Sequence, residues 1–163
     1  MRSRLYQMNA TNIATRVRPI VLMLACFVLA ACGDPPEPPE VEIRAWVAKG
    51  QILAEEKDRR SLMDMISPSY RDARGHERGD IENMFRVYFL RQNSIELLIS
   101  IEDVRVFGDT AAEVDMTVGM AGTNDGVLGF SASAYNFEME LVREDEEWKL
   151  LAARWGEVGG EIR

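Results

Sequence analysis

Hydrophobic residues along this chain follow three successive patterns. Residues 20–31 form an apolar run, residues 41–93 repeat apolar positions every three or four residues, and residues 94–155 alternate apolar and polar positions. The second spacing is typical of amphipathic helices and the third of half-buried strands. Helices followed by a run of strands predict an α+β domain, in which the helices pack on one face of an antiparallel sheet.

The helical part divides into three expected helices. The first begins near Val41, and the second is a shorter helix that Asp58 caps and Pro68 ends. The third begins at Asp80, a good N-cap residue, and ends near Asn93. Its apolar stripe is the clearest helical pattern in the chain and consists of Ile81, Met84, Phe85, Tyr88 and Phe89.

The alternating part predicts four strands. The apolar positions change phase near residues 102–103, which indicates a β-bulge, and residues 108–109 form a Gly-Asp turn. We expect a loop over residues 121–129 and a turn over residues 144–147. Tyr70, between the second and third helices, favours one further short strand.

The apolar run at residues 20–31 has the features of an export signal. Four arginines and no acidic residue precede it, and small residues end it, as in secretory signal peptides. A membrane-spanning helix needs about 20 residues, so an uncleaved anchor helix is the less favoured alternative. The lead before the run is long, so translation starting at Met8 is a second possibility. The next stretch, GDPPEPPE at residues 33–40, predicts an extended, semi-rigid tether of about 25 Å.

The end of the apolar run reads Leu-Ala-Ala-Cys at residues 29–32 and resembles the lipobox of bacterial lipoproteins. The resemblance implies cleavage before Cys32 and acyl chains on its sulfur and new amino group. Cys26 would be removed, so the mature chain would hold one cysteine and no intramolecular disulfide. In that family an aspartate directly after the cysteine favours inner-membrane retention. Gly33 occupies that position. The resemblance therefore implies an envelope protein that faces the periplasm, with the outer membrane slightly favoured over the inner.

The charge balance narrows the expected partners. The formal net charge is −8, and removal of the basic signal would make the mature chain more acidic still. This balance argues against binding to nucleic acid or to an anionic membrane surface. Zinc is not expected either, because His76 is the only histidine and no usable cysteine would remain after cleavage and acylation. No cofactor is predicted.

The order of elements, together with YRDxxG at residues 70–75, GDTA at 108–111 and WKL at 148–150, resembles the nuclear transport factor 2-like fold. The resemblance implies a curved sheet that wraps the helices into a cone, often with an apolar pocket, and an outer sheet face that often forms a homodimer. Members include ketosteroid isomerase, dehydratases, epoxide hydrolases and non-catalytic binding domains, so the fold does not decide function. The expected organisation is a signal peptide (1–31), an acylated cysteine with its tether (32–40), the domain (41–158) and a tail (159–163).

Asp72 is the first candidate for chemistry. In isomerase-like members an aspartate three residues before a glycine acts as the general base, which the resemblance transfers to Asp72 and Gly75. Such a base needs an apolar pocket and a donor for the developing oxyanion, but the first helix offers Trp46 and no tyrosine. The alternative is that Asp72 stabilises the turn to Gly75. His76 is a weaker candidate for proton transfer.

Large side chains could also line a pocket, although packing in the core explains the aromatic ones and surface exposure explains the arginine. The candidate pocket-lining residues are Trp46, Tyr70, Tyr88, Arg154 and Trp155. The preferred function is non-catalytic binding of a small apolar ligand or of a protein partner by a membrane-anchored envelope lipoprotein. The alternatives are a small isomerase, dehydratase or hydrolase that uses Asp72, and a structural accessory subunit of an envelope complex.

Overall fold

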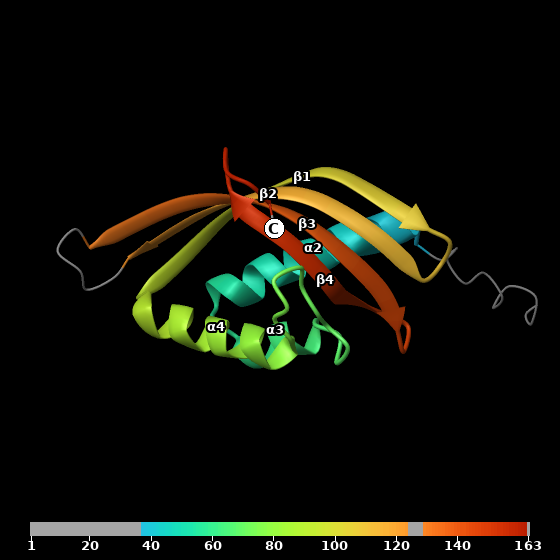
Figure 1. Ribbon diagram of the computed structural model, residues 1–163, viewed down its shortest axis with the longest axis horizontal. Helices are drawn as coiled ribbons and strands as arrows, with labels where there is room; N and C mark the ends of the chain where they lie inside the picture. Colours follow the sequence, from blue (N-terminus) through green and yellow to red (C-terminus); the bar gives the residue numbers. More distant parts are fainter. Residues whose placement is uncertain (1–36, 124–128, 163) are drawn as a thin grey trace, which may run out of the picture. The chain divides into compact units, whose positions relative to one another are not determined.

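Four long strands form one curved antiparallel sheet, and three helices lie on its concave face (Figure 1). The strands are β1 (Ser94–Phe107), β2 (Ala111–Thr123), β3 (Phe130–Glu144) and β4 (Glu147–Glu157), each paired with the next. The helices are α2 (Pro39–Glu55), α3 (Arg59–Asp64) and α4 (Arg78–Arg91). The predicted α+β class, with N-terminal helices packed in the concave face of a curved sheet, is therefore confirmed.

The computed structural model describes residues 37–123 and 129–162. The predicted signal peptide, Cys32 and the tether as far as residue 36 lie outside the described residues, as does most of the loop expected over 121–129. Among the helices of the described residues, none is both long and apolar enough to cross a bilayer.

The predicted bulge sits where the sequence places it. The pairing of β1 with β2 shifts between Ile101 and Asp103, so that Ile101 lies opposite Met116 and Val104 lies opposite Val114. One extra residue restores the alternation, and apolar side chains on both sides of the bulge therefore face the helices. The tight turn after β1 is also confirmed, with Gly108 at φ +62°.

The core fills one end of the concave face. Ile43 on α2, Val114 on β2 and Leu141 on β3 are almost completely inaccessible to solvent. Around them pack the other buried residues of the cluster, namely Val47, Met63, Ile66, Tyr70, Ile81, Ala112, Met139, Trp148 and Ala153. Toward the other end of the sheet the helix-facing side chains, such as Tyr135 and Trp155, are only half-buried.

Two helix starts differ from the prediction, and one is confirmed. Helix α2 begins at Pro39, so the last two residues of the expected tether belong to it, because proline fits the first turn of a helix. Asp58 caps α3 as predicted, accepting the Ser61 N–H at 3.1 Å. The N-cap of α4 is Glu77 and not Asp80. The carboxylate of Asp80 accepts the Glu77 N–H at 2.9 Å, which is one half of a capping box.

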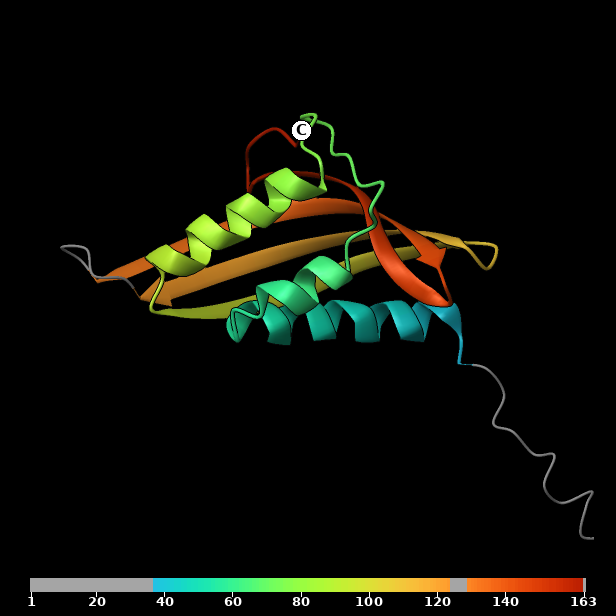
Figure 2. The ribbon, with the colours of Figure 1, turned by 90° about the horizontal axis from the view of Figure 1, so that it is seen from below.

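The stripe predicted for α4 also needs correction. Ile81 is buried and Phe85 packs against the core, but the side chain of Met84 points outward and is 39% exposed. Figure 2 shows α4 as a separate helix that lies across the sheet away from α2. Ile81 is the buried residue of α4, and Phe85, Tyr88 and Phe89 are half-buried, so one side of the helix is covered and the other is exposed.

Both outer strands of the sheet are shielded along part of their length. Beside β4 runs the segment 66–73, which donates the Ser67 N–H to the Leu150 carbonyl at 3.0 Å. It forms isolated bridges and not the short strand expected at Tyr70, because its other contacts are irregular. At β1, the Leu97 backbone donates to the Glu55 carboxylate and accepts from the Gln51 amide, both from α2. Side chains of α2 thus occupy backbone groups that another strand could otherwise pair with.

Candidate functional site

Asp72 is enclosed by its own loop. Its Oδ1 accepts the backbone N–H groups of Arg74 and His76, each at 2.8 Å, and its Oδ2 lies 2.7 Å from Nδ1 of the His76 ring. The carboxylate is completely buried, and Gly75 closes the loop at φ +84°, a conformation that favours glycine. These contacts support the alternative role predicted for Asp72, which is to stabilise the turn to Gly75.

The same contacts determine the acidity of Asp72. Burial raises the pKa of this carboxyl, but hydrogen bonds from the backbone and ring of His76 and from the Arg74 backbone outweigh burial and hold the pKa below its ordinary value. A carboxylate with a lowered pKa and occupied oxygens is a weak general base at neutral pH. Its role in proton abstraction therefore stays a prediction that this geometry does not favour.

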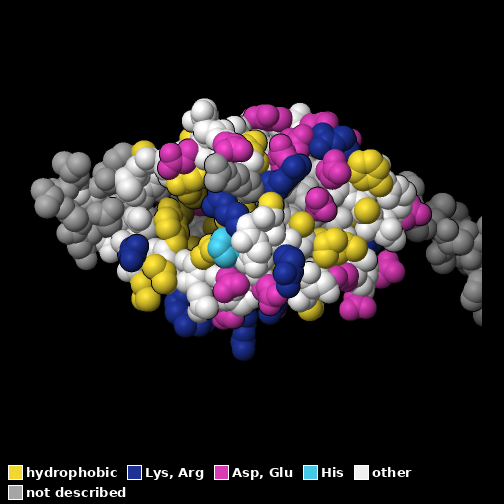
Figure 3. Space-filling model, viewed as in Figure 1, with side chains coloured by type: hydrophobic (Ala, Val, Ile, Leu, Met, Phe, Trp, Pro, Cys, Tyr) yellow, Lys and Arg dark blue, Asp and Glu magenta, His cyan; other side chains and the backbone are white. Residues whose placement is uncertain are grey.

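His76 has the partner that the sequence did not reveal. Because Nδ1 faces Asp72, Nε2 is the ring nitrogen that a ligand would meet. The ring lies against Trp155, with centroids 6.2 Å apart at 27°, and one third of the side chain is exposed. Figure 3 shows this histidine, in cyan, at the surface beside hydrophobic side chains. The feature of the sequence that could have indicated this contact is Gly75, because the chain reverses there and brings positions 72 and 76 together outside any helix.

An aromatic cluster continues from His76 across the concave face. We define it as Trp155 on β4, Phe137 and Tyr135 on β3, and Tyr88 on α4. Trp155 and Phe137 are opposite each other in the sheet register and stack at 6.3 Å, and Phe137 meets Tyr135 at 6.4 Å and 57°. Burial, and then the proximity of Tyr135, raise the pKa of Tyr88. All four rings are half-buried, so part of each ring remains available for a ligand.

A cation borders this cluster. The guanidinium of Arg74 lies 4.6 Å from the centre of the Trp155 ring, and its Nη2 donates to the Trp155 carbonyl at 2.8 Å. The loop that holds Asp72 therefore also presents a positive charge at the face of the aromatic cluster.

The five residues predicted to line a pocket do not meet in one place. Tyr88 and Trp155 belong to the aromatic cluster, but Tyr70 is buried in the core and Trp46 packs against the core from α2. Arg154 lies on the outer face of the sheet, paired with Glu138 at 2.5 Å. Successive residues of a strand point to opposite faces, so Arg154 and Trp155 are separated by the sheet itself.

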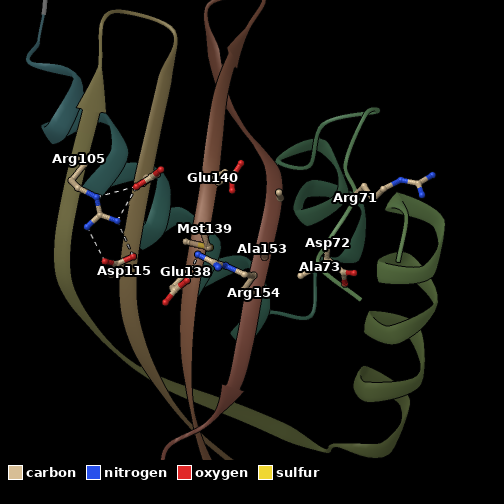
Figure 4. Close-up of a pocket in the computed structure, with 12 residues that line it drawn as sticks. Arg71, Asp72, Ala73, Arg105, Asp115, Glu138, Met139, Glu140, Ala153 and Arg154 are labelled. Carbon is tan, nitrogen blue, oxygen red and sulfur yellow. Dashed lines mark hydrogen bonds and ion pairs between the residues drawn. The ribbon is translucent and has the colours of Figure 1, made fainter. Parts of the chain in front are cut away.

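The outer face of the sheet carries a shallow depression of about 440 Å³, which is strongly charged (Figure 4). The charged residues around it include Arg105, Glu113, Asp115, Glu138, Glu140 and Arg154. Figure 4 shows the Arg105 guanidinium enclosed by carboxylates, with Asp115 at 2.8 Å, and these hydrogen bonds raise the pKa of Arg105 further. The homodimer expected through this face stays a prediction, and the face on which it would form is mainly polar.

A second depression, of about 760 Å³, lies between α2, the end of α3 and the β3–β4 hairpin. Trp46 borders it, and its indole N–H is buried with no hydrogen-bond partner among the described residues. No group of three or more His, Cys, Asp or Glu side chains within residues 37–123 and 129–162 is arranged to hold a metal ion.

Comparisons with known proteins identify the fold. No protein-family model matches the sequence, and no curated protein matches it. A structure from Novosphingobium aromaticivorans named for scytalone dehydratase is similar, with a TM-score of 0.68 and 11% identity over 77% of this chain and 86% of that chain. A ketosteroid isomerase-like protein from Erwinia carotovora atroseptica has a TM-score of 0.60 and 11% identity over 72% and 95% of the two chains.

A Streptomyces avermitilis protein of the NTF2-like family, named for a dehydratase, has a TM-score of 0.62 and 13% identity over 74% of this chain and 96% of that chain. At such low identities a structural likeness establishes the fold and leaves activity open. Residues 39–157 of this chain form a nuclear transport factor 2-like cone of helices and curved sheet.

Proposed function

We propose that this domain binds a small, partly apolar molecule against the aromatic cluster, without catalysis, and that acyl chains on Cys32 anchor it in the bacterial envelope. The observation that carries the binding proposal is the set of four half-buried rings, Tyr88, Tyr135, Phe137 and Trp155, on the concave face. The core residues at the other end of this face are almost completely buried, whereas these rings keep exposed surface. Ligand sites are typically apolar walls with a few polar groups that fix orientation.

The polar groups around the cluster fit a planar ligand that carries a hydroxyl or carbonyl oxygen. His76 presents Nε2 beside the Trp155 ring, and Arg74 places a guanidinium over the same ring. Tyr88 and Tyr135, which interact electrostatically, add two phenol groups. The fold neighbours named for an isomerase and for dehydratases support a small-molecule site, because such enzymes act on small molecules.

The state of Asp72 supports binding over catalysis. Both of its oxygens accept hydrogen bonds from its own loop, and its pKa is lowered. A base that removes a proton from carbon needs a free oxygen and a raised pKa. Neither property is found at Asp72, so a protein that holds its ligand unchanged fits this loop better.

One observation favours a second candidate, a proton-transfer enzyme that uses His76. The 2.7 Å contact between His76 Nδ1 and Asp72 Oδ2 places a carboxylate where it would fix the imidazole tautomer. Nδ1 would then carry the hydrogen and Nε2 would be free to accept a proton. In this reading His76 is the base, Asp72 orients it, and a tyrosine of the aromatic cluster is the oxyanion donor.

Binding can be tested by calorimetry with 2-naphthol as a planar, hydroxylated probe. We expect Trp155→Leu to weaken binding roughly tenfold, because a stacked ring contributes about 1.4 kcal/mol in such a site. Phe107→Leu is the matched control, since Phe107 is an exposed ring at the end of β1. Equal affinities for both variants, or no heat in the wild type, would contradict the proposal. Turnover that His76→Gln abolishes would favour the second candidate.

Anchoring is tested in cells with the full chain. Cys32→Ser should move the protein from the membrane fraction to the soluble fraction and prevent incorporation of labelled palmitate. Cys26→Ser is the control, because that cysteine lies in the segment expected to be removed. A wild-type chain that stays in the membrane with residues 1–31 still attached would show that the anchor is a helix and not a lipid.

A further inference from the structure

Helix α4 exposes apolar side chains on the side that faces away from the sheet. Met84 is 39% exposed, Val87 is 47% exposed and Leu90 is 81% exposed. The spacing of three residues places Val87 and Leu90 on the side of the helix away from Ile81 and Phe85, and Met84 lies between that side and the covered one. The other exposed large hydrophobic residues are spread over α2, β1 and the end of β4. This outward side, which we call the α4 face, is therefore an apolar stripe that no described residue covers.

Two arginines flank the stripe. Arg86 and Arg91 are exposed, and no described residue forms an ion pair with either. The acidic residues of the helix are already engaged: Asp80 in the capping box and Glu82 with Arg59 at 2.5 Å. The exposed C-terminal half of α4 is therefore both apolar and positively charged.

The opposite side of the domain carries the opposite charge. The outer face of the sheet presents a concentration of acids, among them Asp103, Glu113, Asp115, Glu138 and Glu140. Figure 3 shows Asp and Glu side chains over the sheet, with an Arg or Lys among them, and Lys and Arg side chains beside acidic ones at the lower edge, where α4 lies. Such a charge distribution gives the domain a preferred orientation beside any negatively charged surface.

We propose that the α4 face, formed by Met84, Val87, Leu90, Arg86 and Arg91, rests on the anionic bilayer to which Cys32 is anchored. The inference rests on the anchoring in the proposed function. Amphipathic helices lie in the membrane interface with apolar residues among the acyl chains and arginines at the phosphates. The α4 face has the same arrangement over fewer residues. A short face is sufficient when the lipid anchor on Cys32 already holds the chain at the membrane.

A weak contact is sufficient because of the tether. Residues 33–38 separate Cys32 from the start of α2, and the extended tether that their sequence predicts would span about 20 Å. Attachment at that length gives the domain a local concentration of the order of millimolar at the bilayer. The lipid anchor keeps the domain near the membrane, and the α4 face selects which side of it faces the lipid.

The acidic total charge does not prevent this contact, contrary to the expectation from composition. Charges separated by more than about 8 Å are largely screened at physiological salt. The acids of the outer sheet face lie beyond the sheet and the helix layer, and each of these layers is about 10 Å thick. The acids of the outer sheet face are therefore screened from the phosphates that the α4 face contacts. Because Tyr88 lies on the covered side of the same helix, the contact would also bring the aromatic cluster close to lipid.

The test uses the chain from Cys32 onward, coupled through that cysteine to a maleimide lipid, so that it does not depend on natural acylation. Hydrogen exchange in residues 82–93 is compared on vesicles that contain phosphatidylglycerol and on vesicles of phosphatidylcholine alone. We expect slower exchange on the anionic vesicles and loss of that protection in Leu90→Glu. Leu98→Glu is the matched control, since Leu98 is a leucine of nearly equal exposure, 79%, on the outer sheet face. It should retain the protection.

A second measurement uses the uncoupled chain and its partition onto phosphatidylglycerol vesicles. The double variant Arg86→Gln, Arg91→Gln should reduce the partition coefficient roughly 30-fold, because each arginine contributes about one kcal/mol at an anionic surface. The proposal is overturned if Leu90→Glu keeps its protection or if Leu98→Glu loses it equally. It is also overturned if exchange in residues 82–93 slows with rising protein concentration in the absence of lipid, because a second copy of the chain would then cover the face.

Discussion

The imidazole of His76 and the carboxylate of Asp72 are joined by a 2.7 Å contact between Nδ1 and Oδ2, across a loop that reverses direction at Gly75. Asp72 therefore has two tasks at once: it stabilises the loop backbone through Oδ1 and it holds the histidine ring through Oδ2. Since the ring lies on Trp155, the same carboxylate also sets one border of the aromatic cluster.

Removing the carboxylate should destabilise the domain more than neutralising it. Asp72→Ala leaves the N–H groups of Arg74 and His76 without their acceptor, and we expect a loss of about 1–3 kcal/mol in the free energy of unfolding. Asp72→Asn keeps a carbonyl oxygen for those donors and should lose less. Urea denaturation of the two variants measures the difference. Equal losses would mean that the backbone contacts contribute little.

The carboxyl group of Asp72 should also make stability depend on pH. Its folded pKa lies below the ordinary value of 3.8, because hydrogen bonds from His76 and Arg74 outweigh the effect of burial. Between the folded and unfolded pKa values the unfolded chain binds more protons, so the stabilisation is complete above about pH 5 and is lost as the pH falls toward the folded pKa. Denaturant midpoints from pH 3 to 7 should therefore converge for wild type and Asp72→Asn at the acidic end. A constant gap over this range would rule out the linkage.

Two isoleucines of α2 provide a test of where the core lies. Ile43 is completely buried, whereas Ile52, nine positions later on the same helix, is 54% exposed. We expect Ile43→Ala to cost about 2–5 kcal/mol through the cavity it leaves, and Ile52→Ala to change stability by less than about 0.5 kcal/mol. Thermal unfolding followed by circular dichroism gives both values. Similar shifts for the two variants would show that α2 is docked differently.

Two glycines should respond in opposite directions to alanine. A Cβ at Gly156 would lie 2.3 Å from the Glu161 carbonyl oxygen, so Gly156→Ala must displace the C-terminal segment from β4. A Cβ at Gly79 in α4 meets no atom within 4 Å, and Gly79→Ala should stabilise the helix by about 0.5 kcal/mol. Proteolysis of residues 158–163 should become faster only in the first variant. Unchanged cleavage there would contradict the close packing.

Periodicity predicted the order of elements, the bulge near 102–103 and the turn at 108–109, because each follows from which side chains must face the core. It failed where two residues compete for one role. Glu77 and Asp80 are both suitable first-turn acids, and the reciprocal capping box decides which one is the cap. Similarly, Met84 has the spacing of the α4 stripe, but the angle at which the helix docks leaves it outside.

The candidate site was less accessible from the sequence. Asp72 and His76 were each identified, but their contact depends on the fold of a loop, which no helix or strand period encodes. The alternation over residues 94–155 places Phe137 and Tyr135 on one face of a strand, and only the sheet register reveals that Trp155 stacks on that face. Conversely, the alternation of a strand already separates Arg154 from Trp155, so one pocket could not include both side chains.

The side chains of Gln51 and Glu55 that bind the backbone of Leu97 have a consequence for crowding. Proteins at high local concentration meet one another often, and an unprotected sheet margin would allow successive copies to add strands and form a ribbon. By bonding to Leu97 at the open margin of β1, α2 removes one place where such growth could begin. This part of the β1 margin is therefore a poor template for a strand of another copy, even where the protein is concentrated.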